Sequence, residues 1–215
     1  MKLFIYDHCP FCVKARMIFG LKDLSVRLVT LLYDDVTTPT AMIGKKMAPI
    51  LQKDDGTFMP ESMDIVHYID GLDGKPILTG QTNPAIAAWL SHAQSYTGKL
   101  LMPRFANADF EEFATDNARG YFADKKQSTG VDFAALLADS ADLIAQLEED
   151  LQTLSTLIVS PDAVNGTLSE DDIQLFPLLR SLSIVAGVTL PDNVEAYRNR
   201  MAKRCEISLL LDMEQ

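Results

Sequence analysis

The segment DHCPFCVKAR, residues 7–16, constrains the fold of this chain more than any other stretch. It follows an apolar run at 2–6 that is typical of a buried strand, and it precedes apolar residues at helical spacing. Pro10 suits the first position of that helix, because the N–H that proline lacks would have no partner there. Cys9 therefore falls at a strand-to-helix turn, and Cys12 lies one turn into the helix.

The residues up to about position 72 alternate between strand and helix patterns. The β-branched and aliphatic segment at 26–32 predicts a second strand. Two short apolar segments flank Asp55 and Gly56, a dipeptide that favours a hairpin, and a further helical pattern follows Ser62. The order strand, helix, strand, helix, two strands and helix predicts an α/β domain at 1–72 with a mixed four-stranded sheet and helices.

The second half of the chain has a different pattern. Residues 73–84 collect Gly, Pro, Asn and Thr, which predicts a linker. Beyond it no strand pattern appears, and apolar residues recur at alternating spacings of three and four, as at Ile144, Leu147, Leu151, Leu154 and Ile158. We therefore expect residues 85–215 to form an all-helical bundle.

The composition limits the partners and the compartment. A formal net charge of −11 argues against a nucleic-acid footprint, which needs a dense basic face, and disfavours anionic membrane surfaces. No segment is apolar for long enough to span a bilayer. The apolar run near the start of the sequence is too short for a signal peptide. We therefore expect a cytoplasmic protein, in which a close cysteine pair is redox-active or metal-binding.

The position of Cys9 favours nucleophilic chemistry. The free amides and the dipole at a helix start stabilise a thiolate, and each unit by which its pKa falls is worth about 1.4 kcal/mol. Cys12, inside the helix, should be more buried and less ionised, yet close enough to attack a mixed disulfide at Cys9. We therefore assign attack on substrate to Cys9 and resolution to Cys12.

A structural metal site and two inert cysteines are the alternatives for the pair. A zinc site needs four ligands, and the other Cys and His residues are scattered along the sequence, at His8, His67, His92 and Cys205. A C-x-x-C beside a strand-helix-strand pattern is instead typical of thioredoxin-like redox domains. We expect no metal.

Several neighbours of the pair have two readings. Lys14 and Arg16 add positive charge near the thiolate, more weakly than the helix start. His8 precedes the nucleophile and could tune it, but we favour a solvated turn residue. We interpret Tyr6 as strand packing and Cys205 as a free structural cysteine.

Two further segments suggest how a thiol substrate is held. A cis bond between Ala48 and Pro49 would expose the Ala48 backbone to an extended peptide, although few such bonds are cis. Glu61 and Ser62 stand at the start of a predicted helix, where free amides suit a carboxylate and Glu61 suits an ammonium group. Capping of the helix by Ser62 is the simpler reading.

The sequence of the second half also predicts where one of its helices begins. Ser169 and Asp172 have the spacing of a capping box, and an acidic first turn follows Ser169. We interpret this cluster as a structural cap and not as a metal site.

These motifs together resemble the large bacterial glutaredoxins that are built like glutathione transferases. The matching segments span most of the chain: YDHCPFCVKARMIFGLK, APILQKDDG, MPESMDIVHYID, LDGKP and NGTLSEDDIQLFPLLR. The resemblance implies a glutathione-transferase-like architecture, with a thioredoxin-like N-terminal domain and a helical C-terminal domain. It also implies reduction of protein disulfides and glutathione mixed disulfides with glutathione as electron donor, and it suggests a monomer.

The resemblance carries over to particular residues. It implies that the backbone of Ala48, before a cis Pro49, pairs with the cysteinyl part of glutathione. It places the γ-glutamyl end on Glu61 and Ser62, and the cap of the helical domain falls on Ser169 and Asp172. The chain departs from the common pattern in having Pro-Phe between the cysteines and Ala before the proline, and we expect neither change to abolish activity.

We therefore expect a glutathione-dependent thiol-disulfide oxidoreductase, a dithiol glutaredoxin that reduces disulfide-containing or glutathionylated proteins. Glutathione is the reducing co-substrate, and the sequence has no nucleotide-binding fingerprint. Two alternatives stay open: a glutathione transferase that conjugates electrophiles, and a non-enzymatic redox-switch protein.

Overall fold

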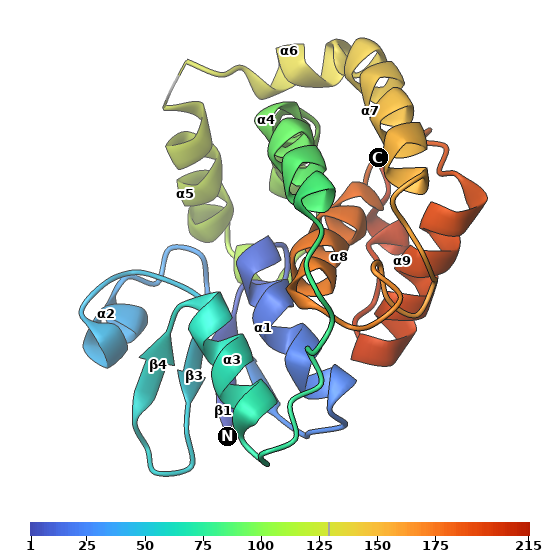
Figure 1. Cartoon of the computed structure of the whole chain (residues 1–215). Coiled ribbons are helices and arrows are strands. Elements are labelled where there is room, and N and C mark those ends of the chain that lie inside the picture. The colour runs from blue at the N-terminus through green and yellow to red at the C-terminus, as the bar shows by residue number, and fades with distance from the viewer. Residues whose placement is uncertain (129) are drawn as a thin grey trace.

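The computed structural model describes residues 1–128 and 130–215. Its first half contains the elements β1 (Lys2–Ile5), α1 (Pro10–Leu21), β2 (Arg27–Thr30), α2 (Thr37–Ile43), β3 (Ile50–Gln52), β4 (Phe58–Pro60) and α3 (Ser62–Gly71). The strands form a mixed four-stranded sheet in the order β2-β1-β3-β4, and α1 packs against α3 (Figure 1). The predicted α/β domain and its mixed sheet are confirmed.

The register of the sheet determines which loops share an edge. Phe4 of β1 pairs with Ile50 of β3, and Ile50 pairs with Pro60 of β4, both antiparallel. The end of β1, the start of β3 and the end of β4 therefore meet at one edge of the sheet. The segment from Tyr6 to Cys12, the Ala48–Pro49 peptide and the start of α3 all lie at this edge.

The second half is a bundle of helices, as expected. It contains α4 (Pro84–Asn107), η1 (Glu111–Phe113), α5 (Asp116–Gln127), α6 (Phe133–Ala138), α7 (Ser140–Ser155), α8 (Glu170–Leu182), α9 (Asp192–Cys205) and η2 (Leu211–Met213), where η denotes a 3₁₀ helix. Helix α1 contacts both α8 and α9, so it is covered by the sheet domain and by the bundle (Figure 1). A helix buried on several sides holds its first turn, and hence Cys9, in a defined place.

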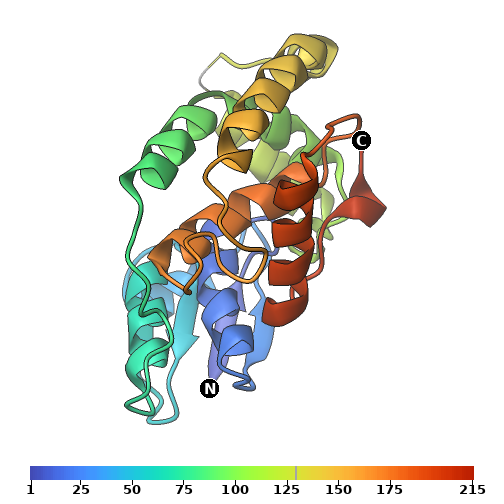
Figure 2. The same ribbon diagram turned by 45° about the vertical axis from the view of Figure 1, so that its right-hand side comes forward.

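The connection between the halves is irregular and hydrogen-bonded. It rises along one side of the molecule from α3 to α4 (Figure 2). Lys22, which directly follows α1, donates a hydrogen bond to Asp73 at 2.8 Å, and the Gly80 N–H donates to the Leu168 carbonyl at 2.7 Å. These bonds attach the connection to both halves, while the domain limits at residues 72 and 85 stay predictions.

The capping box at the start of α8 is present. The Ser169 side chain accepts a hydrogen bond from the Asp172 N–H, and the Asp172 carboxylate accepts one from the Ser169 N–H at 2.9 Å. The same carboxylate also accepts from the Val164 N–H and, at 3.0 Å, from the Tyr197 hydroxyl of α9. One buried carboxylate therefore joins the preceding loop, the start of α8 and the side of α9.

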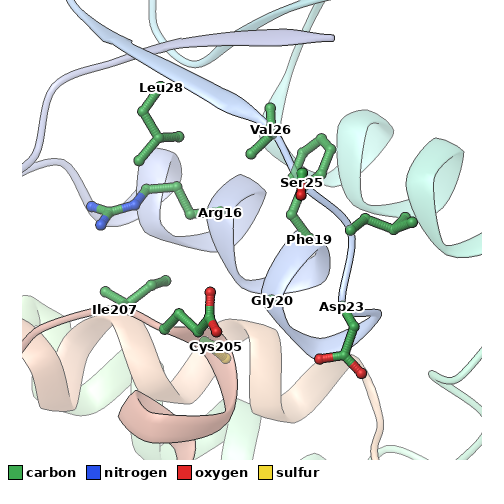
Figure 3. A pocket seen from close by; sticks show the side chains of 11 residues that line it. Arg16, Phe19, Gly20, Asp23, Ser25, Val26, Leu28, Cys205 and Ile207 are labelled. Carbon is green, nitrogen blue, oxygen red and sulfur yellow. The ribbon is translucent and has the colours of Figure 1, made fainter.

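Helix α1 approaches α9 most closely at Gly20. A Cβ atom at Gly20 would lie 2.2 Å from the Cys205 carbonyl oxygen, which is far inside van der Waals contact. Figure 3 shows Gly20 and Cys205 beside a cavity of about 400 Å³, which is bounded by α1, the segment leading into β2 and the end of α9. Cys205 is buried and free, and burial raises its pKa to about 12, which favours a structural role.

Gly20→Ala should therefore destabilise the protein by about 1–3 kcal/mol, because the added methyl group forces α1 away from the α9 backbone. Gly120→Ala in α5 is the matched control, because nothing lies within 4 Å of the Cβ position there. In a helix this control should stabilise by up to about 1 kcal/mol. Urea unfolding of both variants measures the difference, and equal midpoints would contradict the close approach.

Candidate active site

The two cysteines of the CPFC segment lie in different environments. Cys9 is the N-cap residue of α1, with extended backbone dihedral angles, and Pro10 opens the helix. The Cys9 side chain is partly exposed, whereas Cys12 is fully buried. Both thiols are free. The predicted turn from strand to helix and the predicted difference in burial agree with these positions.

The surroundings of Cys9 favour its thiolate. A hydrogen bond from the Cys12 thiol is the main cause that lowers the pKa of Cys9 to about 6. Burial opposes this effect, while the charge of His8 and the amides of Phe11 and Cys12 support it. An ordinary cysteine has a pKa of about 8.5, so Cys9 is largely ionised at neutral pH where a typical thiol is not.

Cys12 has the opposite behaviour. Burial raises the pKa of Cys12 well above its ordinary value, and the neighbouring Cys9 raises it further. The Tyr6 N–H donates to the Cys12 sulfur at 3.4 Å. The pair therefore consists of one ionised, accessible sulfur and one protonated, sheltered sulfur. This arrangement supports nucleophilic attack by the first and a later reaction of the second.

The predicted cationic neighbours of Cys9 have other partners. Arg16 forms a short ion pair with Asp7, and the Lys14 ammonium donates to the Gln174 side chain of α8. Burial lowers the pKa of Lys14, although the Cys9 charge opposes this. Lys14 thus still interacts electrostatically with the Cys9 thiolate. Arg16 instead pairs with Asp7, in the turn that precedes Cys9.

The expectation that His8 is a solvated turn residue is wrong. His8 is only 6% exposed, and its backbone N–H donates to Glu112 Oε1 at 2.9 Å. Its Nδ1 atom lies 2.7 Å from the same oxygen. The reason is tertiary: η1 of the helical half covers this turn and brings Glu112 to it.

Asp7 is held by the helical half as well. The buried Arg180 of α8 donates to the Asp7 carbonyl at 2.7 Å and to both Asp7 carboxylate oxygens at 3.0 Å. Sequence analysis did not identify Glu112 or Arg180. Glu112 lies in no motif, and Arg180 ends the NGTLSEDDIQLFPLLR segment without any sign there of a link to Asp7. Each is more than a hundred residues from its partner, so only the tertiary fold brings these pairs together.

The second predicted element of the site lies at the same sheet edge. The Ala48–Pro49 peptide is cis. Just before it, the Lys46 ammonium lies 5.7 Å from the Tyr6 ring centroid and 4.3 Å from that of Tyr33. The loop before β3 thus contacts residues that flank the cysteine turn.

The start of α3 differs in detail from the expectation. Ser62 is the first residue of the helix and does not cap it, since Glu61 occupies the N-cap position with φ of 69° and ψ of 118°. A positive φ at a residue other than glycine is strained by about 1–3 kcal/mol and is typical of ligand-binding sites. The exposed Glu61 carboxylate accepts a hydrogen bond from Lys45 at 3.2 Å.

An apolar hollow of about 260 Å³ lies beside Pro10 and Phe11, the residues between the cysteines, where α1 faces the helical half. Its walls include Phe11 and Lys14 of α1 and residues of α4 and α8. Phe11 is 55% exposed, and the Lys14 ammonium lies 5.1 Å from its ring centroid. Phe11, the second of the two residues between the cysteines, therefore faces solvent, where it can touch a substrate.

Residues 1–128 and 130–215 contain no group of three or more His, Cys, Asp or Glu residues that could hold a metal ion. Within the same residues, the helices are all too short or too polar to cross a membrane.

Comparison with known proteins places these features in a family. A family model described as the N-terminal domain of glutathione S-transferase matches residues 3–76, and one described as the C-terminal domain of glutaredoxin 2 matches residues 85–214. Glutaredoxin 2 of Escherichia coli strain K12 is 60% identical over 213 residues, which is 99% of each chain.

Solved structures give the same relationship. Glutaredoxin 2 from Salmonella typhimurium, in complex with glutathione, has a TM-score of 0.99 and 59% identity, and the match covers 100% of this chain and 98% of that one. Glutathione transferase GSTFuA3 from Phanerochaete chrysosporium has a TM-score of 0.70 at 17% identity over 94% and 96% of the chains, a likeness of fold alone.

The fold is therefore that of the glutathione transferases, with a thioredoxin-like first domain and a helical second domain. Its sheet edge carries a cysteine pair with one ionised sulfur. Within this class, the chain belongs to the glutaredoxin 2 family.

Proposed function

We propose that this protein is a glutathione-dependent thiol-disulfide oxidoreductase that reduces protein disulfides and glutathione mixed disulfides through Cys9 and Cys12. The observation that carries the proposal is the partly exposed Cys9 at the N-cap of α1, one helical turn before the fully buried Cys12. The lowering of the Cys9 pKa to about 6 by this environment agrees with it. Membership of the glutaredoxin 2 family supports the same chemistry.

The first step is attack by the Cys9 thiolate on a disulfide. With a glutathionylated protein, Cys9 bonds to the glutathione sulfur, the protein–glutathione disulfide breaks, and the protein leaves as a thiolate that takes a proton from solvent. The thiolate of a free glutathione then attacks the sulfur of the bound glutathione. Glutathione disulfide leaves, and the Cys9 thiolate is restored.

With a protein disulfide, Cys12 performs the second step. Once Cys9 is bonded to substrate sulfur, its negative charge and its hydrogen bond to Cys12 are lost. The charge and the hydrogen bond both raise the pKa of Cys12 while they are present. Because the first step removes them, Cys12 ionises more easily after that step than before it. The Cys12 thiolate then attacks Cys9, releases the second substrate thiolate and leaves a Cys9–Cys12 disulfide, which two glutathione molecules reduce.

Glutathione occupies the sheet edge in this proposal. The backbone of Ala48, before the cis Pro49, pairs with the cysteinyl unit and directs its sulfur to Cys9. The strained Glu61 and the adjacent Ser62 at the start of α3 bind the γ-glutamyl ammonium and carboxylate groups. The glutathione complex of the Salmonella typhimurium relative supports a glutathione site on this fold.

The proposal also covers the substrates, the oligomeric state and the compartment of the protein. The substrates are glutathionylated or disulfide-containing proteins, the working form is a monomer and the compartment is the cytoplasm. The net charge of −11 supports partners other than nucleic acid.

Cys12→Ser should retain reduction of glutathione mixed disulfides and lose most of the reduction of protein disulfides, because only the second reaction needs a resolving thiol. Cys9→Ser should lose both, and Cys205→Ser should lose neither. Coupled assays with glutathione and glutathione reductase, on a glutathionylated peptide and on a protein disulfide, measure the three variants. Equal losses in Cys9→Ser and Cys12→Ser would contradict the assigned roles.

Glu61→Ala should raise the KM for glutathione about tenfold, the effect expected for loss of one charged contact to the ligand, with a smaller change in kcat. Asp64→Ala is the matched control, because Asp64 is an exposed carboxylate in the same first turn of α3. Steady-state kinetics with varied glutathione tests both, and an equal KM for Glu61→Ala and wild type would exclude Glu61 from the glutathione site.

A further inference from the structure

A buried carboxylate of the helical half holds the residue before Cys9. Glu112 lies in η1, and its side chain has no exposure to solvent. Its Oε1 atom accepts a hydrogen bond from the His8 backbone N–H at 2.9 Å and lies 2.7 Å from His8 Nδ1. Both the backbone and the ring of His8 are thus held at one acceptor oxygen.

Aromatic side chains enclose this pair. Centroids of five rings lie between 5.1 and 5.9 Å from that of His8, and they belong to Tyr33, Phe105, Phe110, Phe113 and Phe122. The second carboxylate oxygen, Glu112 Oε2, is buried and has no hydrogen-bond partner among the described residues. In such apolar surroundings an ionised carboxylate is costly unless a cation pairs with it.

The geometry gives Glu112 an ionic partner in His8. The Nδ1 atom of His8 lies 2.7 Å from Glu112 Oε1, so a ring protonated on both nitrogens would donate to this oxygen and balance the carboxylate charge. Arg180, the nearby guanidinium of α8, is instead bonded to Asp7 and to the Ser208 carbonyl. The other titratable or charged groups around the turn include Tyr6, Cys9, Cys12, Lys14, Arg16, Tyr33 and Lys46.

We propose that Glu112 is a positioning residue for the thiol-disulfide reaction, holding a positively charged His8 ring beside Cys9 so that the Cys9 thiolate is favoured. This inference rests on the proposed function in taking Cys9 as the nucleophile. The positive charge of His8 is one of the causes that lower the pKa of Cys9. The helical half therefore sets part of the reactivity of a sulfur that belongs to the other domain.

The direction in which the pKa of Cys9 changes when Glu112 is neutralised separates this role from a merely structural one. The negative charge of Glu112 by itself disfavours a nearby thiolate, and it contributes to the raised pKa of Cys12. If Glu112 only packed against the turn, its neutralisation would leave the pKa of Cys9 unchanged or lower it. If Glu112 holds a charged His8, neutralisation releases the ring proton and raises the pKa of Cys9.

The test compares Glu112→Gln with Glu111→Gln. Glutamine keeps the shape of Glu112 and an acceptor for the His8 N–H but removes the charge. Glu111 is the matched control, because it is the neighbouring residue in η1 and is exposed, with a hydrogen bond from Thr30. The rate of Cys9 alkylation by iodoacetamide, measured by mass spectrometry from pH 4 to pH 9, gives its pKa without any assay of glutathione activity.

We expect the midpoint for Glu112→Gln to rise by about one pH unit, so that alkylation below pH 6 slows about tenfold. The control should match the wild type. A midpoint that is unchanged or lower in Glu112→Gln would overturn the proposal. A wild-type protein whose Cys9 has no midpoint below pH 8 would instead refute the proposed function, so the two failures are distinguishable.

A second measurement needs no variant. The ¹⁵N chemical shifts of the His8 ring in the reduced wild-type protein at pH 7 report whether both nitrogens carry protons. Two protonated nitrogens support the charged pair. A neutral ring with a single protonated nitrogen overturns it, even if Glu112→Gln fails to fold.

Discussion

The hydrogen bond from the Cys12 thiol to the Cys9 sulfur, at the start of α1, is the interaction on which the chemistry of this protein depends. It requires one sulfur to be protonated and buried while the other is ionised and accessible, and the C-x-x-C spacing on a helix start provides both. Cys12 is in this way both the group that activates Cys9 and the group that later attacks it. When Cys9 reacts, this hydrogen bond and the Cys9 charge are lost, and the Cys12 thiol ionises more easily than it did before.

The helical half contributes to the site through the turn before Cys9. Arg180 binds the backbone and the carboxylate of Asp7, and Glu112 binds the backbone and the ring of His8. The two residues directly before Cys9 are thus held by side chains from α8 and η1. Gly20 permits α1 to lie against α9, so that the helix carrying both cysteines is enclosed by the bundle. Through these contacts the helical half fixes the turn that precedes the nucleophile of the first domain.

Sequence reasoning succeeded where structure is determined locally. The strand and helix order, the hairpin at Asp55–Gly56 and the capping box at Ser169 each follow from a few neighbouring residues, and the different burial of the two cysteines follows from the helix start. It failed where distant residues decide. His8 was expected in solvent because nothing near it in sequence signals Glu112 or the surrounding aromatic rings. Ser62 was expected to cap α3, but Glu61 takes the N-cap position with a positive φ, which its residue type does not indicate.

The ionisation of Cys9 is the most direct test of this account. Absorbance of the reduced protein near 240 nm reports thiolate formation as the pH rises, and Cys9→Ser provides the baseline. The account predicts one thiolate with a midpoint near pH 6, absent from Cys9→Ser, with no second thiolate until strongly alkaline pH. A Cys9 that stays protonated above pH 8 would contradict it, because the thiol hydrogen bond and the helix start would then fail to activate the sulfur.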